Sequence, residues 1–240
     1  MTTVRGGRPF YGEVLGVLML DKRVPRIPGD MGNAWTFDVP VRFHVVPGVQ
    51  GEAFRRGDRT LAGPIVRAAQ ELEATGVRAI AGCSGFFAAY QRDLAEAVRV
   101  PVFSSSLLLL PLIYEMLGRR QGIGVITADA AALGKHHFEG VGAAHVPVVV
   151  EGLERYGEIR AILDDEETLD PERLGEQVVA AVRRLRGREP GVGALLLECH
   201  NLPPYGPVLR RETDLPIFDI YSLVALIHHA LVKKDFQGLL

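Results

Sequence analysis

Two cysteines, Cys83 and Cys199, are the strongest candidates for chemistry in this 240-residue sequence. Each ends a short apolar run and precedes a segment with helical spacing, so each is expected at the carboxyl end of a strand. Ligands of open α/β sheets bind at that edge of the sheet. A thiol has an ordinary pKa of about 8.5, so its surroundings can tune it to act as a base or an acid near neutral pH. The simpler alternative is a pair of buried, unreactive cysteines, a common fate of the free residue.

Cys199 also precedes a predicted helix whose first turn contains Pro203 and Pro204, a place where proline is accepted. The dipole of that helix would favour the thiolate form of Cys199. A serine hydroxyl, such as that of Ser84, does not readily exchange a proton in this way unless another group activates it.

Other residues at predicted strand ends carry groups that can bind a carboxylate, because backbone N–H groups and short polar side chains at helix starts hold oxygen anions. The candidates for substrate binding are Gly85, Ser105, Thr127, His200 and Asn201, with Ser84 as either a binder or a catalyst. Helix capping explains the same residues equally well. Arg23 and Arg26 lie in a Pro/Gly-rich loop that could fold over such a site, although solvated loop charges are the simpler interpretation.

Composition restricts the compatible classes of protein. Apolar residues make up 48% and charged residues 23%, with a formal net charge of −2. These values exclude a disordered chain and argue against a basic nucleic-acid-binding protein. Two cysteines are too few for a disulfide scaffold or a multi-cysteine zinc site. The longest apolar run, residues 107–113, contains Pro111 and is far shorter than the ~18 residues that span a membrane. With no recognisable signal peptide, we expect a cytoplasmic protein without nucleic-acid or membrane partners.

Signals for a cofactor or a metal are weak. The Gly-x-Gly segments 122–124 and 191–193 precede predicted strands, whereas a dinucleotide-binding loop follows one. The histidine pairs 136–137 and 228–229 lie in predicted helices, where adjacent residues face different directions and make a poor metal site. We therefore predict neither a cofactor nor a metal.

Short apolar runs alternate with segments of helical periodicity along most of the chain, which predicts parallel sheets in an α/β fold. The predicted strands are residues 13–20, 36–46, 77–83, 100–103, 121–128, 145–150, 192–198 and 216–218. The predicted helices are residues 60–75, 87–98, 107–117, 130–141, 171–186, 202–213 and 222–233.

The sequence also repeats itself, which predicts two similar halves. Three residues recur 115 positions later: Tyr90, Pro101 and Phe103 as Tyr205, Pro216 and Phe218. Residues 16–18 match residues 124–126 at an offset of 108, and the acidic loop 164–167 is the expected site of the insertion that accounts for the difference. At the offset of 115, Cys199 aligns with Ser84, so the two thiols are not symmetry mates unless a slip of one residue restores Cys83.

Residues 82–86 (GCSGF) and 198–205 (ECHNLPPY) resemble the two cysteine motifs of the aspartate/glutamate racemase superfamily, and residues 21–33 resemble the N-terminal loop of one of its branches. The superfamily includes hydantoin racemase and arylmalonate decarboxylase. The resemblance, which extends from Gly12 to Leu231, implies two pseudosymmetric Rossmann-like α/β lobes with the active site between them. It also implies a homodimer, and catalysis without a cofactor by one cysteine from each lobe on a carbon next to a carboxylate or carbonyl.

One position departs from that motif. Matched on Gly85 and Phe86, the first cysteine of the branch falls on Ser84, and the thiol is displaced to Cys83. Arylmalonate decarboxylase is similar in this respect, because it keeps only the second-lobe cysteine and protonates one face of its substrate.

By this resemblance, residues 1–105 and 220–240 form the first lobe and residues 106–219 form the second. The expected function is racemisation or epimerisation of an aspartate- or glutamate-like amino acid, with Cys199 as one acid/base and Cys83 or Ser84 on the opposite face. The alternatives are a decarboxylase or isomerase that uses Cys199 alone, and a non-catalytic protein that binds a small carboxylate.

Overall fold

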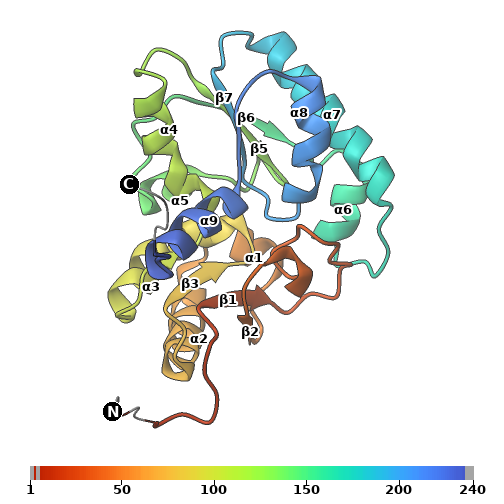
Figure 1. Cartoon of the computed structure of the whole chain (residues 1–240). Coiled ribbons are helices and arrows are strands. Elements are labelled where there is room, and N and C mark those ends of the chain that lie inside the picture. The colour runs from red at the N-terminus through yellow and green to blue at the C-terminus, as the bar shows by residue number, and fades with distance from the viewer. Residues whose placement is uncertain (1–2, 4–5, 236–240) are drawn as a thin grey trace, which may run out of the picture.

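The structure, a computed structural model, describes residue 3 and residues 6–235 and contains two four-stranded parallel sheets in separate lobes (Figure 1). The first sheet has the order β2-β1-β3-β4 and consists of β1 (Leu15–Leu20), β2 (Val41–Val46), β3 (Ala79–Gly82) and β4 (Val102–Phe103). The second sheet has the order β6-β5-β7-β8 and consists of β5 (Ile123–Thr127), β6 (Val148–Gly152), β7 (Ala194–Leu197) and β8 (Ile217–Phe218). The predicted fold class, two pseudosymmetric α/β lobes built on parallel sheets, is confirmed.

Helices cover both sheets. The α-helices are α1 (Gly51–Arg55), α2 (Ala62–Thr75), α3 (Gln91–Ala97), α4 (Leu110–Met116), α5 (Lys135–Gly140), α6 (Gly157–Leu163), α7 (Pro171–Arg188), α8 (Gly206–Glu212) and α9 (Ile220–Leu231). The 3-10 helices are η1 (Ala34–Thr36), η2 (Arg59–Leu61), η3 (Gly85–Tyr90), η4 (Ser106–Leu109) and η5 (Pro203–Tyr205). Figure 1 shows α9 crossing the middle of the molecule, and Ile220, Leu223 and Val224 of this helix join the core of the first sheet. None of the described helices is long and apolar enough to cross a membrane.

Helix α7 illustrates how the sequence defines these elements. The Asp170 side chain accepts a hydrogen bond from the Arg173 N–H and caps the helix, and Pro171 occupies its first turn. Leu174, Val178 and Leu185 form part of a buried stripe at helical spacing that packs on the second sheet.

The residues of β7 alternate between two hydrophobic cores. Ala194 and Leu196 belong to a core that continues into the first sheet, whereas Leu195 and Leu197 belong to the core beneath α7 and α8. Successive residues of a strand point to opposite faces of the sheet, and a core covers each face here. The four residues of this strand are therefore all buried. The shared core fixes the end of β7 relative to the first lobe.

The two lobes share details that confirm the repeat. Gly16 in β1 and Gly124 in β5 lie opposite a residue of β3 and β7 respectively. A Cβ at Gly16 would lie 2.7 Å from the Leu72 side chain of α2, and a Cβ at Gly124 would lie 3.0 Å from that of Leu185 in α7. In each lobe, a glycine of the first strand therefore allows a leucine of the covering helix to approach closely.

The insertion lies a few residues after the predicted site. The linkers 56–61 and 164–170 have nearly the same length, so the acidic loop adds little to the second lobe. Helix α7 has 18 residues whereas its counterpart α2 has 14, and the extra length lies mainly in this helix. Leu72 and Leu185 correspond at an offset of 113, as do the last residues of the two helices, so the extra residues of α7 lie at its N-terminal end, shortly after the acidic loop.

Several predicted elements also need correction. The strand predicted over residues 36–46 is confined to Val41–Val46, because residues 34–36 form η1 and Pro40 lacks a donor for the ladder. The helix predicted from Ala130 begins only at Lys135, because Gly134 has an extended backbone. The short helices α1 and α6 were not predicted, since five to seven residues carry too little periodicity to detect.

Replacing Leu72 by alanine is expected to lower the free energy of unfolding by about 2–5 kcal/mol, because it opens a cavity where the side chain fills the space above Gly16. Urea denaturation measures the difference. Leu226→Ala, at a position that is 53% exposed on α9, is the matched control and should change it by less than about 0.5 kcal/mol. Equal losses in the two variants would contradict the packing described here.

Candidate active site

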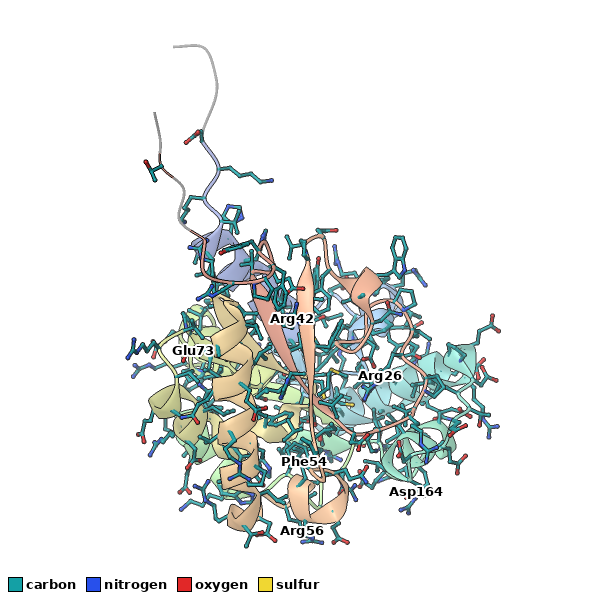
Figure 2. All side chains as sticks on the ribbon, turned by 90° about the horizontal axis from the view of Figure 1, so that it is seen from below. Arg26, Arg42, Phe54, Arg56, Glu73 and Asp164 are labelled. Carbon is teal, nitrogen blue, oxygen red and sulfur yellow. The ribbon has the colours of Figure 1, made fainter. Side chains whose placement is uncertain are left out.

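A small cavity of about 50 Å³ lies between the two lobes, at the carboxyl ends of their strands. Residues from both halves of the chain line it: Lys22, Val24, Arg26, Gly51, Phe54, Arg55, Ser84, Phe86, Ala128, Ile162, Leu163, Glu198, Cys199, His200 and Asn201. Figure 2 shows Arg26 inside the molecule near the junction of the lobes, whereas Arg56 and Asp164 lie at its edge. A larger groove of about 550 Å³ between α7 and α8 contains neither cysteine.

Cys199 is the second residue after β7 and is almost completely buried. Its thiol donates a hydrogen bond to Asn201 Oδ1 at 3.5 Å. Burial, followed by the charge of Glu198, raises the pKa of the Cys199 thiol to about 12, and the Asn201 backbone N–H and Arg26 offset this only in part. The thiol is therefore protonated at neutral pH. The expectation that a helix dipole favours the thiolate is wrong here, because helical structure begins only at Pro203 and burial dominates.

Cys83 directly follows β3 but does not line the cavity. Its sulfur accepts a hydrogen bond from the Leu20 N–H at 3.2 Å, and burial raises the pKa of its thiol. Ser84, the next residue, does line the cavity. Strands β3 and β7 begin 115 residues apart, at Ala79 and Ala194, so Ser84 has the place in the first lobe that Cys199 has in the second.

The loop 21–33 after β1 closes one side of the cavity by contacting the second lobe. Lys22 Nζ donates hydrogen bonds to the carbonyl oxygens of Ile162 and Leu163. Asn201 Nδ2 donates to Asp30, which also forms an ion pair with Arg26 at 3.2 Å. Arg26 thus lies against the cavity, and the proposal that this loop charge is solvated is wrong for Arg26. It holds for Arg23, whose side chain is 79% exposed and pairs with Glu167.

Three cations line the cavity, and sequence reasoning missed two of them. Arg55 of α1 forms an ion pair with Asp129 at 3.2 Å, while Lys22 has only backbone partners among the described residues. Burial, with the nearby charges of Arg26 and Arg55, lowers the pKa of Lys22. An anion entering the cavity would relieve this repulsion. Lys22 could have been suggested by its place just beyond a predicted strand, but no sequence signal marks Arg55.

His200 lines the cavity, yet both of its ring nitrogens already have hydrogen-bond partners. Nδ1 donates to the Gly82 carbonyl at 2.9 Å, and Nε2 accepts from the Ser106 N–H at 3.4 Å. Burial lowers the pKa of His200 to about 3, so the imidazole is neutral. His200 therefore joins the lobes and has no free nitrogen for a substrate in this conformation.

The remaining predicted residues lie behind the cavity wall. Thr127 Oγ1 donates to Glu198 Oε2 at 2.7 Å, and Gly85 packs directly against Glu198. Ser105 Oγ accepts from the Leu107 N–H at 3.2 Å and caps η4, as the capping alternative for such residues predicts. Among the described residues, no cluster of His, Cys, Asp and Glu could hold a metal ion.

The sequence matches the family model described as Asp/Glu/Hydantoin racemase over residues 41–226. The chain belongs to this racemase family. The resemblance inferred from the two cysteine motifs is thereby confirmed.

Two relatives of this racemase-family chain are named as dimethylsulfoniopropionate lyases. One, from Durusdinium sp. clade D, is 30% identical over 230 residues, which cover 92% of this chain and 73% of the relative. Another, dimethylsulfoniopropionate lyase 5 from Emiliania huxleyi (strain CCMP1516), is 29% identical over 235 residues, which cover 93% of this chain and 46% of the relative. The chain spans about half the length of the Emiliania relatives.

Solved structures share the fold of this racemase-family chain. Picrophilus torridus aspartate racemase has a TM-score of 0.59 at 12% identity, covering 94% of this chain and 96% of that one. Unliganded arylmalonate decarboxylase has a TM-score of 0.58 at 15% identity, covering 94% of each chain. These similarities establish the architecture, and the chemistry has to be argued from the cavity itself.

Glu198→Gln is expected to stabilise the protein at alkaline pH. Burial raises the pKa of Glu198 from 4.5 to about 7, so its stabilising contribution as a neutral acid is complete below pH 4.5 and is lost as pH rises through 7. At pH 9 the ionised side chain costs roughly 3 kcal/mol, which glutamine avoids. Thermal unfolding should show a higher Tm for the variant at pH 9 and a much smaller difference at pH 5.

The matched control is Glu151→Gln in β6, which removes a similarly buried carboxylate. Glu151 is paired with Arg184 and Arg188, so this variant should lower Tm at both pH values. An effect of Glu198→Gln that did not depend on pH would contradict the raised pKa of Glu198.

Proposed function

We propose that this protein is a cofactor-independent enzyme in which the Cys199 thiol exchanges a proton with the carbon next to a substrate carboxylate. The supporting observation is that Cys199 lines an inter-lobe cavity together with Lys22, Arg26 and Arg55. The cations bind the carboxylate and stabilise the charge that moves onto it when the proton leaves. The thiol is an acid/base group of the kind this proton transfer requires.

The substrate is a small carboxylate that enters when the loop 21–33 opens. A cavity of about 50 Å³ has room for only a few water molecules. The loop closes it through a few polar contacts, such as those of Lys22 and Asp30 with the second lobe. Closure then excludes water, which strengthens the electrostatic interactions around the substrate.

The reaction is elimination rather than racemisation. Racemisation needs a second acid on the opposite face of the carbon, and the first-lobe counterpart of Cys199 is the hydroxyl of Ser84, while the Cys83 thiol lies outside the cavity. The two dimethylsulfoniopropionate lyases, at 30% and 29% identity, support this choice.

In the elimination, the Cys199 thiolate takes the proton from the carbon next to the carboxylate. The electrons of that C–H bond form a double bond to the next carbon, whose bond to the leaving group breaks and leaves its electron pair there. With dimethylsulfoniopropionate, the products are acrylate and dimethyl sulfide, and the proton stays on the thiol.

A second candidate is racemisation of an aspartate- or glutamate-like amino acid. Ser84 favours it, because this hydroxyl lines the same cavity as Cys199. The pseudosymmetry of the lobes places Ser84 and Cys199 at corresponding strand ends, as a reaction on two faces of one carbon requires.

Cys199→Ala is expected to lower turnover about 10³-fold, because it removes the acid/base group. The assay follows dimethyl sulfide release from dimethylsulfoniopropionate, together with deuterium uptake from solvent at the carbon next to the carboxylate of this compound, aspartate and glutamate. Cys83→Ala is the matched control and should retain turnover, since its sulfur lies outside the cavity.

Ser84→Ala distinguishes the two candidates, because it should spare elimination and abolish racemisation. Full activity in Cys199→Ala would contradict the proposed chemistry. Binding of these carboxylates without exchange or conversion would identify a binding protein instead.

A further inference from the structure

Glu198 carries a buried oxygen that has no partner. The side chain follows β7 and is completely buried. Its Oε2 accepts a hydrogen bond from Thr127 Oγ1 at 2.7 Å, whereas Oε1 has no hydrogen-bond partner among the described residues. A buried polar atom without a partner costs about 1–3 kcal/mol, so its persistence requires an explanation.

The position of Oε1 is adapted to the junction of the lobes. Glu198 lines the same cavity as Cys199 and Ser84. A Cβ at residue 85 would overlap Oε1 and the backbone oxygen of Glu198, so glycine is required for this close approach. The absent side chain at Gly85 therefore leaves room for a carboxyl group at the cavity wall.

Glu198 has a counterpart in the first lobe that does not line the cavity. At the offset of 115 that relates β3 to β7, Glu198 corresponds to Cys83. Both side chains contact the last residue of the first strand of their lobe, since Cys83 accepts from the Leu20 N–H and Glu198 accepts from Thr127. Of the two, only Glu198 lines the cavity and has an oxygen, Oε1, without a hydrogen-bond partner among the described residues.

The neutral form of Glu198 suits this place. Burial raises its pKa to about 7, Thr127 lowers the pKa and Asp129 raises it. Because Thr127 donates to Oε2, the proton of the neutral acid lies on Oε1. An ionised Glu198 would oppose catalysis, because its charge raises the pKa of the Cys199 thiol.

We propose that Glu198 is a second catalytic residue, whose Oε1 hydroxyl donates a hydrogen bond to the substrate carboxylate while Cys199 removes the neighbouring proton. The inference rests on the proposed proton transfer by Cys199. As the C–H electrons move towards the carboxylate, its oxygens gain charge, and a buried donor that is hydrogen-bonded to one of them stabilises the transition state more than the ground state. The hydrogen bond also gives Oε1 the partner that none of the described residues supplies.

The two groups then compete for a single proton. The reacting state combines a Cys199 thiolate with a neutral Glu198, in a cavity whose other charged groups are Lys22, Arg26 and Arg55, with Asp129 and Asp30 as partners of the two arginines. Below pH 7 the population of this state rises with pH as the thiol ionises. Above it, each gain of thiolate is offset by a loss of neutral acid, so kcat/KM becomes level.

Glu198→Gln tests the proposal, since the amide keeps the size of the side chain and removes the acidic proton. We expect kcat for dimethylsulfoniopropionate to fall about 10²–10³-fold with KM nearly unchanged. The level region of kcat/KM above pH 7 should also disappear and be replaced by a continuous rise. Glu151→Gln, in the other buried glutamate of the same lobe, is the control and should leave kcat unchanged.

A second measurement does not depend on turnover. Infrared difference spectra on adding propionate, a non-reacting carboxylate, should show a shift of a protonated carboxyl band that is absent in Glu198→Gln. Unchanged kcat and an unchanged pH profile in Glu198→Gln, or the absence of that band shift, would overturn the inference. If Cys199→Ala instead keeps full activity, the proposed function fails separately.

Discussion

The site depends on the contact between the carboxyl ends of β3 and β7. His200, just after β7, donates to the Gly82 carbonyl at 2.9 Å, and Ser106 Oγ, in the connection that follows β4, donates to the Leu197 carbonyl at 2.9 Å. These bonds join backbone groups at two strand ends and lie beside a hydrophobic core that continues between the sheets. Each side chain at these strand ends therefore has a fixed place relative to the other lobe, which the pre-organisation of a catalytic site requires.

This contact also brings several ionisable groups together in a buried place. A thiol, a carboxyl group and three cations share a cavity of about 50 Å³. Burial raises the pKa of Cys199 to about 12 and that of Glu198 to about 7, and lowers the pKa of Lys22. Cys199, Glu198 and Lys22 are thus each shifted towards the neutral form. A bound carboxylate would stabilise the charged form of Lys22 and supply a partner for Glu198.

The lobes have the same architecture, and in the proposed mechanism they have different roles. The first lobe supplies Lys22, Arg26 and Arg55, which suit carboxylate binding, while the second supplies Cys199 and Glu198, which suit proton transfer. Because Ser84 and not Cys83 lines the cavity, Cys199 supplies its thiol and the first lobe supplies a hydroxyl. Such asymmetry is compatible with a racemase fold whose relatives include proteins named as lyases.

The sequence by itself determined the two α/β lobes, their repeat and the alignment of Ser84 with Cys199, because these follow from local periodicity and from residues repeated at a fixed offset. The sequence could not show that Arg55 lines the cavity, that burial keeps the Cys199 thiol protonated, or that one oxygen of Glu198 has no partner among the described residues. Those properties arise from burial and from contacts between residues far apart in the chain, such as Thr127 with Glu198. Desolvation is set by everything that surrounds a group, and only the tertiary structure brings those surroundings together.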